Sequence, residues 1–250
     1  MKRRTNLWTV MLSGGDGERL RTFVHRLFGR DRAKQYCTFI GNRTMFDSTV
    51  DRARMLAPLH HSVAVVAKSH VERGWVGREQ MPEGKLLAQP NNHDTGPGVL
   101  LPLAYVRRKD PDASVVILPC DHFVYPECLF TRTVRNAVEA AEAFPERVVL
   151  LGASPEKVDA DLGWIELGGS LCSSFNSGVY RVSRFVEKPP AEEAAQMMRA
   201  GGLLNTLVIV SRLNSLWTLG RSHFPQTLAL LERAANASDT DREDQALHRV

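Results

Sequence analysis

The stretch LSGGDGERL, Leu12 to Leu20, restricts what this chain can fold into more than any other segment. The apolar run of residues 7–12 (LWTVML) predicts a buried strand, and this strand leads directly into Gly14, Gly15 and Gly17. Glycine permits positive φ angles and close approach to the main chain, so the N–H groups of such a turn can surround an anion. From these residues alone, an ordinary strand-to-helix turn is an equally good interpretation.

The loop differs from two widespread glycine-rich nucleotide motifs. No Gly-Lys-Ser/Thr follows it, as a P-loop requires, and Leu20 stands where the dinucleotide fingerprint has its third glycine. Arg19 adds a planar guanidinium whose paired N–H donors suit a phosphate group. If the turn binds phosphate, it does so as a motif of another kind.

The composition fits a chain with a substantial core. Of its 250 residues 43% are hydrophobic, and the formal net charge of +4 suits anionic small molecules without indicating a nucleic-acid partner. No apolar run approaches the length of a membrane span, and the first is too short for a signal peptide. Cys37, Cys120, Cys128 and Cys172 show no C-x-x-C spacing, which favours reduced thiols. We therefore expect a soluble, cytoplasmic protein that does not associate with membranes.

Strands and helices are expected to alternate through the first part of the chain. Such alternation predicts an α/β fold with a parallel, doubly wound sheet, whose binding site lies at the carboxyl ends of the strands. After the first strand, further strands are expected at residues 62–67, 85–88, 115–118 and 148–151, helices at 45–57, 70–80, 97–108 and 131–144, and an irregular loop at 21–32.

Beyond Gly152 the pattern changes. Two strand-like runs, at residues 163–167 and 178–186, are separated by a segment rich in Gly, Ser and Asn, which predicts an antiparallel hairpin laid on the parallel sheet. A helix at 191–200, a strand at 203–211 and a largely helical segment at 213–235 are expected to follow. The predicted fold is thus Rossmann-like and mostly parallel, with an added antiparallel hairpin.

Two polar residues follow predicted strands and are candidates for ligand binding. Asp121 comes directly after the apolar run VVILP, where a carboxylate can hold Mg²⁺ together with substrate phosphates. A backbone hydrogen bond or a helix cap is the alternative role for this aspartate. Thr95 stands at the start of a predicted helix, where it would meet an anion or only serve as the N-cap.

Several of these segments together resemble the sugar-1-phosphate nucleotidyltransferase family, and most closely its mannose-1-phosphate guanylyltransferase branch. The segments GGDGERL and AKQY carry the likeness, and LPCDH, QPNNHDTGPG, GWIELG and FVEKPP follow in the family's order. The chain departs from the family where Arg21, Thr22 and Phe23 replace a segment that usually contains proline, and where Ala33 precedes Lys34. The resemblance covers residues 7 to about 211 and implies the nucleotide-diphospho-sugar transferase fold.

On the nucleotide side, the resemblance implies that Gly14, Gly15 and Gly17 hold the triphosphate together with Arg19. It further implies that Lys34 contacts the phosphates, that Thr95 lies next to the nucleotide, and that Asp121 binds the metal, Mg²⁺. A second metal-binding aspartate, which the family carries further along its sequence, is not found in this chain.

On the sugar side, the resemblance implies that Gly163 allows the sugar to approach the main chain and that Glu187 binds its hydroxyls. Lys188 would neutralise the phosphate of the sugar 1-phosphate, and Asn205 would contact the sugar. The residues alone also fit a plain hairpin strand, an exposed Glu-Lys pair and an asparagine with a structural hydrogen bond. Around Asn205 the match is weaker, since Leu204 replaces a tryptophan and Leu207 a glycine.

The implied function is the joining of a sugar 1-phosphate to a nucleoside triphosphate, with release of pyrophosphate. Mannose 1-phosphate and GTP are the substrates that the resemblance suggests, although no residue pattern settles the sugar or the base. Arg19, Lys34, Asp121 and Lys188 would act in catalysis. A non-catalytic nucleotide or sugar-nucleotide sensor with the same fold is the alternative.

The domain organisation follows from the same likeness. Residues 1–250 are expected to form a single nucleotidyltransferase domain. Residues 239–250 begin another helical pattern without a cap, and the family's chains continue beyond this point, so a domain lacking its C-terminal portion is the other interpretation. Enzymes of the family often self-associate, and the sequence leaves a homo-oligomer open.

Overall fold

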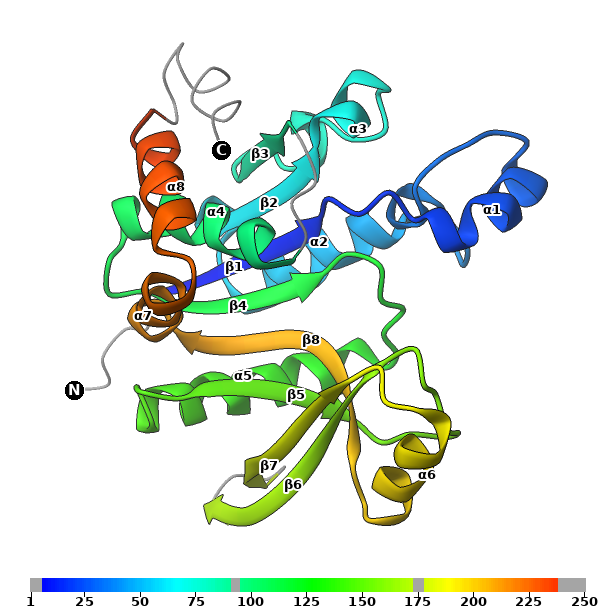
Figure 1. Ribbon diagram of the computed structural model, residues 1–250. Helices are drawn as coiled ribbons and strands as arrows, with labels where there is room; N and C mark the ends of the chain where they lie inside the picture. Colours follow the sequence, from blue (N-terminus) through cyan, green and yellow to red (C-terminus); the bar gives the residue numbers. More distant parts are fainter. Residues whose placement is uncertain (1–5, 91–94, 173–177, 238–250) are drawn as a thin grey trace.

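The computed structural model describes residues 6–90, 95–172 and 178–237, and the predicted helix start at 239–250 lies outside these ranges. Its centre is one eight-stranded sheet with the strand order β3-β2-β1-β4-β8-β6-β7, and β5 pairs with β8 beside this path. Figure 1 shows helices on both faces of the β1–β4 region. The predicted α/β class, with a mostly parallel sheet and an antiparallel addition, is confirmed.

The parallel part consists of β1 (Leu7–Ser13), β2 (Ser62–Ala67), β3 (Lys85–Gln89) and β4 (Ser114–Pro119), all close to their predicted positions. β1 lies between β2 and β4 and is parallel to both. These strands are buried because both faces of the sheet are covered, which explains their nearly continuous apolar sequences. Their carboxyl ends meet at one edge.

Two helical layers cover the parallel strands. The side chains of Val10 and Ile117 pack into the layer that contains α4 (Thr95–Lys109), α7 (Leu213–His223) and α8 (Pro225–Ala237). Those of Met11 and Leu118 pack into the opposite layer, with α2 (Met45–Leu56) and α5 (Glu127–Ala143). Neighbouring residues on one strand thus enter different layers, as the two-residue period of a strand requires.

The antiparallel part is built around β8 (Leu203–Arg212), which pairs with β4, with β5 (Val148–Ala153) and with β6 (Gly163–Cys172). β5 was expected in the parallel sheet, and this was wrong, because β8 inserts between β4 and β5 and runs against both. β6 and β7 (Val179–Glu187) form the predicted hairpin. The hairpin extends the edge of the sheet through β8 and does not lie on its face (Figure 1).

Two predictions about helices need correction. The expected loop at 21–32 contains α1 (Arg21–Phe28), which projects from the body (Figure 1) and ends at Gly29, where φ is 67°. The expected helix at 70–80 is instead the short α3 (Lys68–Glu72) and a 3₁₀ turn, η4 (Arg78–Gln80). The prediction of a largely helical segment at 213–235 is confirmed by α7 and α8, with one break directly before Pro225, which cannot continue the hydrogen bonds of α7.

The remaining elements are short. α6 (Ala191–Arg199) follows the hairpin as predicted, and the 3₁₀ turns η1 (Glu18–Leu20), η2 (Lys34–Tyr36) and η3 (Leu59–His61) lie in the connections. Within the described residues, no helix has both the length and the apolar character that crossing a bilayer would require.

Candidate active site

A cavity of about 590 Å³ lies at the carboxyl ends of the parallel strands. It brings together the predicted nucleotide-side residues from four separate segments. These are Gly14, Gly15, Gly17, Arg19, Lys34, Thr95 and Asp121, and the other lining residues are Leu12, Ser13, Glu18, Leu20, Gln35, Val65, Gln89, Gly98, Pro119 and Leu207. The structure thus places this half of the predicted site in one cavity, while the roles of the individual residues stay predictions.

The glycine loop needs its glycines for different reasons. Gly17 has φ 67°, and a Cβ there would lie 3.1 Å from the backbone nitrogen of Lys34. A Cβ on Gly14 would lie 2.7 Å from the side-chain nitrogen of Gln89, whereas one on Gly15 would meet no atom of the described residues within 4 Å. The main chain at Gly15 is therefore open to a ligand, which is the property that an anion-binding turn requires.

Gln35 holds the glycine loop in place through two hydrogen bonds. Its Nε2 donates to the carbonyl oxygens of Ser13 at 3.1 Å and of Gly15 at 2.7 Å. Gln35 is buried, so its amide has no competing contact with bulk water. Lys34 and Gln35 both belong to the AKQY segment, but a role was predicted only for Lys34.

His70 is a second buried support of the loop, at 1% exposure. Its Nδ1 lies 3.3 Å from the hydroxyl of Tyr36, and its Nε2 lies 3.4 Å from Oδ1 of Asp16 in the glycine loop. Burial lowers the pKa of His70, and the carboxylate of Asp16 acts in the opposite direction. The Tyr36 hydroxyl donates to the carbonyl oxygen of Ser13 at 3.1 Å, and Nε2 of His70 has no hydrogen-bond partner among the described residues. The imidazole therefore approaches Asp16 without a well-formed hydrogen bond, and its burial favours the neutral form.

Lys34 and Asp121 form the polar centre of the cavity. Nζ of Lys34 lies 2.7 Å from Oδ2 of Asp121, and both side chains are about one-third exposed, at 33% and 34%. The other carboxylate oxygen of Asp121 is 3.9 Å from Nε2 of His122. A cation and a carboxylate thus lie beside the glycine loop. A phosphate group there would require the cation, and a metal ion would require the carboxylate.

The donor set at this place fits Mg²⁺ in one binding mode. Among the described residues no group of three or more His, Cys, Asp or Glu side chains converges, so a cage made of protein ligands is not present in that part of the chain. Mg²⁺ commonly binds through one or two carboxylates together with water and substrate phosphates. Asp121, which lines a cavity of about 590 Å³ beside the glycine loop, matches this mode.

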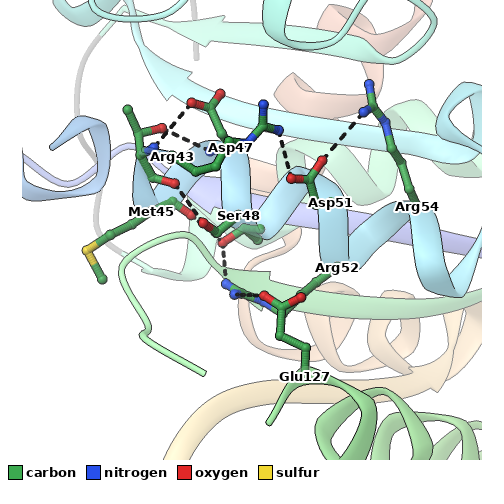
Figure 2. Close-up of polar contacts among 10 residues, drawn as sticks. Arg43, Met45, Asp47, Ser48, Asp51, Arg52, Arg54 and Glu127 are labelled. Carbon is green, nitrogen blue, oxygen red and sulfur yellow. Dashed lines mark hydrogen bonds and ion pairs between the residues drawn. The ribbon is translucent and has the colours of Figure 1, made fainter. Parts of the chain in front are cut away.

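A buried arginine on α2 fixes the segment that follows Asp121. Arg52 is only 3% exposed, and its Nη2 donates to Oγ1 of Thr49 at 2.6 Å and to the carbonyl oxygen of His122 at 3.3 Å. Its Nη1 lies 3.4 Å from Oε1 of Glu127 in the first turn of α5, as Figure 2 shows. Burial lowers the pKa of Arg52, while Glu127 raises it. Sequence reasoning missed this residue, since its partners are far away along the chain.

The other charged residues of α2 differ sharply from Arg52. Asp51 on the exposed side pairs with Arg43 at 2.7 Å and with Arg54 at 3.5 Å (Figure 2). The helix begins with a capping box between Thr44 and Asp47, which fixes its first turn. One face of α2 therefore carries solvated ion pairs, and the other carries a single buried cation directed at the site.

The predicted sugar-side residues lie at the base of the hairpin, next to the cavity but not in its lining. A Cβ on Gly163 would come within 2.7 Å of Oε2 of Glu187 and 3.4 Å of Cβ of Asn205, so these three residues are close neighbours. Nζ of Lys188 is 3.9 Å from Oε1 of Glu187, and both side chains are more than half exposed. We call Gly163, Glu187, Lys188 and Asn205 the hairpin group.

Thr95 and Asn205 have local roles beside the predicted ones. Thr95 is the first residue of α4 and lines the cavity, so the helix presents its N-terminal end to a ligand there. Asn205 uses its Oδ1 to accept a hydrogen bond from the backbone N–H of Leu207 at 3.1 Å. The structural hydrogen bond considered for Asn205 is therefore present, and contact of the remaining amide group with a sugar stays a prediction.

Curated relatives of this chain include alginate biosynthesis proteins and mannose-1-phosphate guanylyltransferases. The alginate biosynthesis protein AlgA of Pseudomonas fluorescens is 28% identical over 247 residues, which cover 95% of this chain and 49% of AlgA. The mannose-1-phosphate guanylyltransferase of Escherichia coli K12 is 26% identical over 245 residues, with the same two coverages. The chain thus spans about half the length of these curated relatives.

Solved structures agree with the fold. A mannose-1-phosphate geranyltransferase from Thermus thermophilus superposes with a TM-score of 0.82 at 25% identity, over 98% of this chain and 68% of the other. A mannose-6-phosphate isomerase from Helicobacter pylori gives a TM-score of 0.70 at 18% identity, over 93% and 80%, which shows the fold alone. The family model described as nucleotidyl transferase matches residues 8–245. This chain therefore belongs to the nucleotidyl transferase family.

Proposed function

We propose that the chain catalyses the joining of a sugar 1-phosphate to a nucleoside triphosphate, with release of pyrophosphate. The observation that carries this proposal is the meeting of the glycine loop, Arg19, Lys34 and Asp121 in one cavity beside the hairpin group. Mannose 1-phosphate and GTP are the proposed substrates, because relatives such as the E. coli enzyme are named mannose-1-phosphate guanylyltransferases.

In the proposed reaction, an oxygen of the sugar phosphate attacks the α-phosphorus of the nucleotide. A new P–O bond forms, the bond from the α-phosphorus to the bridging oxygen breaks, and pyrophosphate leaves with the electron pair. The protein has little covalent work in such a transfer and acts by positioning and by neutralising charge. The glycine loop and Arg19 would bind the triphosphate, and Lys34 would follow the charge that develops on the phosphates.

The acceptor would be held by the hairpin group. Lys188 would pair with the phosphate of the sugar 1-phosphate, Glu187 would accept hydrogen bonds from sugar hydroxyls, and Gly163 leaves room for the ring. Asp121 would hold Mg²⁺, whose chemistry is to neutralise phosphate charge and to align the two substrates. Lys34 now occupies one oxygen of Asp121, so nucleotide phosphates must draw Lys34 away before that oxygen becomes available.

A nucleotide or sugar-nucleotide sensor is the second candidate. Two observations favour it: the direct Lys34–Asp121 ion pair at 2.7 Å, which occupies the proposed metal ligand, and the presence of Leu207 in the lining of the cavity. A sensor would bind nucleotide with a similar affinity whether or not a sugar 1-phosphate is present, and would release no pyrophosphate.

Pyrophosphate release tests the proposal. Common nucleoside triphosphates are crossed with a panel of sugar 1-phosphates in the presence of Mg²⁺, using this chain and the longer protein if its coding sequence continues. We expect release that requires one nucleotide and one sugar together. No pyrophosphate release with any pair of substrates, with nucleotide binding intact by calorimetry, would replace the enzyme by the sensor.

The matched control uses two aspartates at opposite ends of β4. Asp121→Asn alters the proposed metal ligand, whereas Asp112→Asn alters an exposed carboxylate before the strand, far from the cavity. Only the first variant is expected to abolish release. Equal activity of both variants would remove Asp121 from the mechanism.

A further inference from the structure

Leu207 has a backbone conformation that leucine rarely adopts. Its φ is 56°, in the left-handed region, and Lys188 is the only other non-glycine residue with positive φ among the described residues. For a residue with a branched side chain this conformation is unfavourable, and it persists only where the surroundings impose it. Leu207 lies in β8 and lines the cavity, whereas Lys188 directly follows β7 and is outside the lining.

An irregularity in β8 imposes this conformation. Between paired positions, β5 advances two residues, from Leu150 to Gly152, while β8 changes by four, from Ile209 to Asn205. The extra residues of β8 form a bulge. β8 uses the bulge to change neighbours, because its C-terminal half lies beside β4 and its N-terminal half pairs with β6.

Two polar side chains hold the bulge in place. Oδ1 of Asn205 accepts from the N–H of Leu207 at 3.1 Å, and Oγ1 of Thr206 accepts from the N–H of Val208 at 3.2 Å. The same hydroxyl donates to the carbonyl oxygen of Leu151 at 2.6 Å. The direction of the Leu207 side chain is therefore set by the main chain and not by chance packing.

Leu207 lines the cavity that contains the glycine loop, while its N–H is bonded to Asn205 of the hairpin group. Of the residues that the structure describes, no other in β8 and none in the hairpin lines this cavity. We infer that Leu207 is a specificity-determining residue, an apolar wall between the nucleotide cavity and the hairpin group that limits which sugar 1-phosphates can reach the nucleotide. This inference rests on the proposed function and adds a steric filter to it.

The test separates the side chain from the backbone. Leu207→Ala removes the wall but keeps a Cβ at positive φ, whereas Leu207→Gly removes the wall and relieves the backbone. Leu204→Ala, on the same strand but packed against the Trp164 cluster, is the control for loss of a leucine from β8. Calorimetry measures the binding of nucleoside triphosphates, and then the binding of a panel of sugar 1-phosphates to the chain loaded with a non-hydrolysable nucleotide, so the readout does not depend on turnover.

We expect both Leu207 variants to bind sugar 1-phosphates about tenfold more tightly, or to accept sugars that the unaltered chain rejects. Their nucleotide affinity and the sugar affinity of Leu204→Ala should not change. Leu207→Gly should also melt roughly 2–4 °C above Leu207→Ala, because glycine tolerates the positive φ.

Contrary results would have different meanings. Sugar-phosphate binding that is present but equal in all the chains would show that Leu207 does not limit sugar access. The proposed function would still hold. A loss of nucleotide affinity in both Leu207 variants would show that Leu207 packs against the nucleotide. This result would also contradict its proposed role in sugar specificity. If every chain binds nucleotide and none binds a sugar phosphate, both the proposed function and the proposed role of Leu207 are wrong.

Discussion

The glycine-loop side of the site and the hairpin side are built in different ways. The loop rests on buried polar side chains, Gln35 and His70, and Arg52 fixes the segment after Asp121. On the hairpin side, Glu187 and Lys188 are more than half exposed, and the charged groups of this pair are 3.9 Å apart. Because buried, hydrogen-bonded side chains restrict motion, the loop side is preorganised, whereas the hairpin group must be ordered by its ligand.

This difference suggests an order of events. A preorganised cavity would bind the proposed nucleotide with little loss of conformational entropy, while the exposed hairpin group would lose that entropy when a sugar phosphate binds. A bound triphosphate would also add negative charge that draws Lys34 away from Asp121. We therefore expect nucleotide to bind before the sugar 1-phosphate. Four predictions test this difference between the glycine-loop side and the hairpin side, in decreasing order of expected effect.

Asp121→Asn should have the largest effect on turnover. The substitution keeps the size of the side chain but removes the charge that would hold Mg²⁺, so pyrophosphate release should fall by roughly 100-fold or more. The side chain is 34% exposed and its partner Lys34 remains solvated, so the melting temperature should change little. A large drop in melting temperature, with the remaining folded protein fully active, would assign Asp121 a structural role.

Arg52→Met should have the largest effect on stability. It leaves the carbonyl oxygen of His122 and the hydroxyl of Thr49 without their donor, a loss of about 1–3 kcal/mol in the free energy of unfolding. Arg54→Ala is the control on the same helix, and since its pair with Asp51 is exposed, it should cost about 1 kcal/mol or less. Chemical denaturation measures both. Equal losses would show that the buried contacts of Arg52 contribute no more than a surface ion pair.

The residues of the glycine-loop side could be predicted from the sequence, whereas the buried side chains that support them could not. The glycine loop and Asp121 each follow a run of apolar residues, so a local pattern was enough to place them at the ends of strands. Arg52 contacts residues about 70 positions away, at His122 and Glu127, and His70 meets Asp16 across a similar gap in sequence. No local spacing encodes such contacts, because they exist only once α2 and α3 have packed on the sheet.

On the hairpin side, the order of the strands in the sheet could not be predicted from local sequence patterns either. Each strand there was recognised from its own residues, but the insertion of β8 between β4 and β5 depends on pairing across more than 50 residues. The bulge at Leu207 was equally invisible, since it arises where β8 changes partners. A leucine within an apolar run predicts a regular strand position, and only the sheet order explains its positive φ.

Lys188→Ala should separate the two sides of the site. Because Lys188 is exposed and outside the nucleotide cavity, the variant should keep its melting temperature and its affinity for nucleoside triphosphate. Loss of a charge-assisted contact to phosphate should weaken sugar 1-phosphate binding by about tenfold. Arg221→Ala removes an exposed cation from α7 as the control. Weaker nucleotide binding in Lys188→Ala would mean that the two sides are not independent.

The smallest expected effect concerns pH and the support beneath the glycine loop. Burial lowers the pKa of His70 below its ordinary value near 6.5, so the folded chain keeps the imidazole neutral while the unfolded chain takes up a proton as the pH falls. Stability from His70 is therefore complete above about pH 6.5 and is lost progressively below it. The groups that face it are Asp16, whose carboxylate opposes the shift, Arg73, whose charge adds to it, and the Tyr36 hydroxyl.

Replacing His70 with Gln tests this expectation. Glutamine has no proton to take up in this range, so the difference in unfolding free energy between pH 7.5 and pH 5.5 should be smaller in His70→Gln than in the unaltered chain. Some pH dependence should remain, because burial also lowers the pKa of His122. Since His70 contacts Asp16 in the loop, nucleotide affinity should fall in the variant while sugar 1-phosphate affinity does not. A variant with an unchanged pH dependence and unchanged nucleotide affinity would show that the loop is held by Gln35 without help from His70.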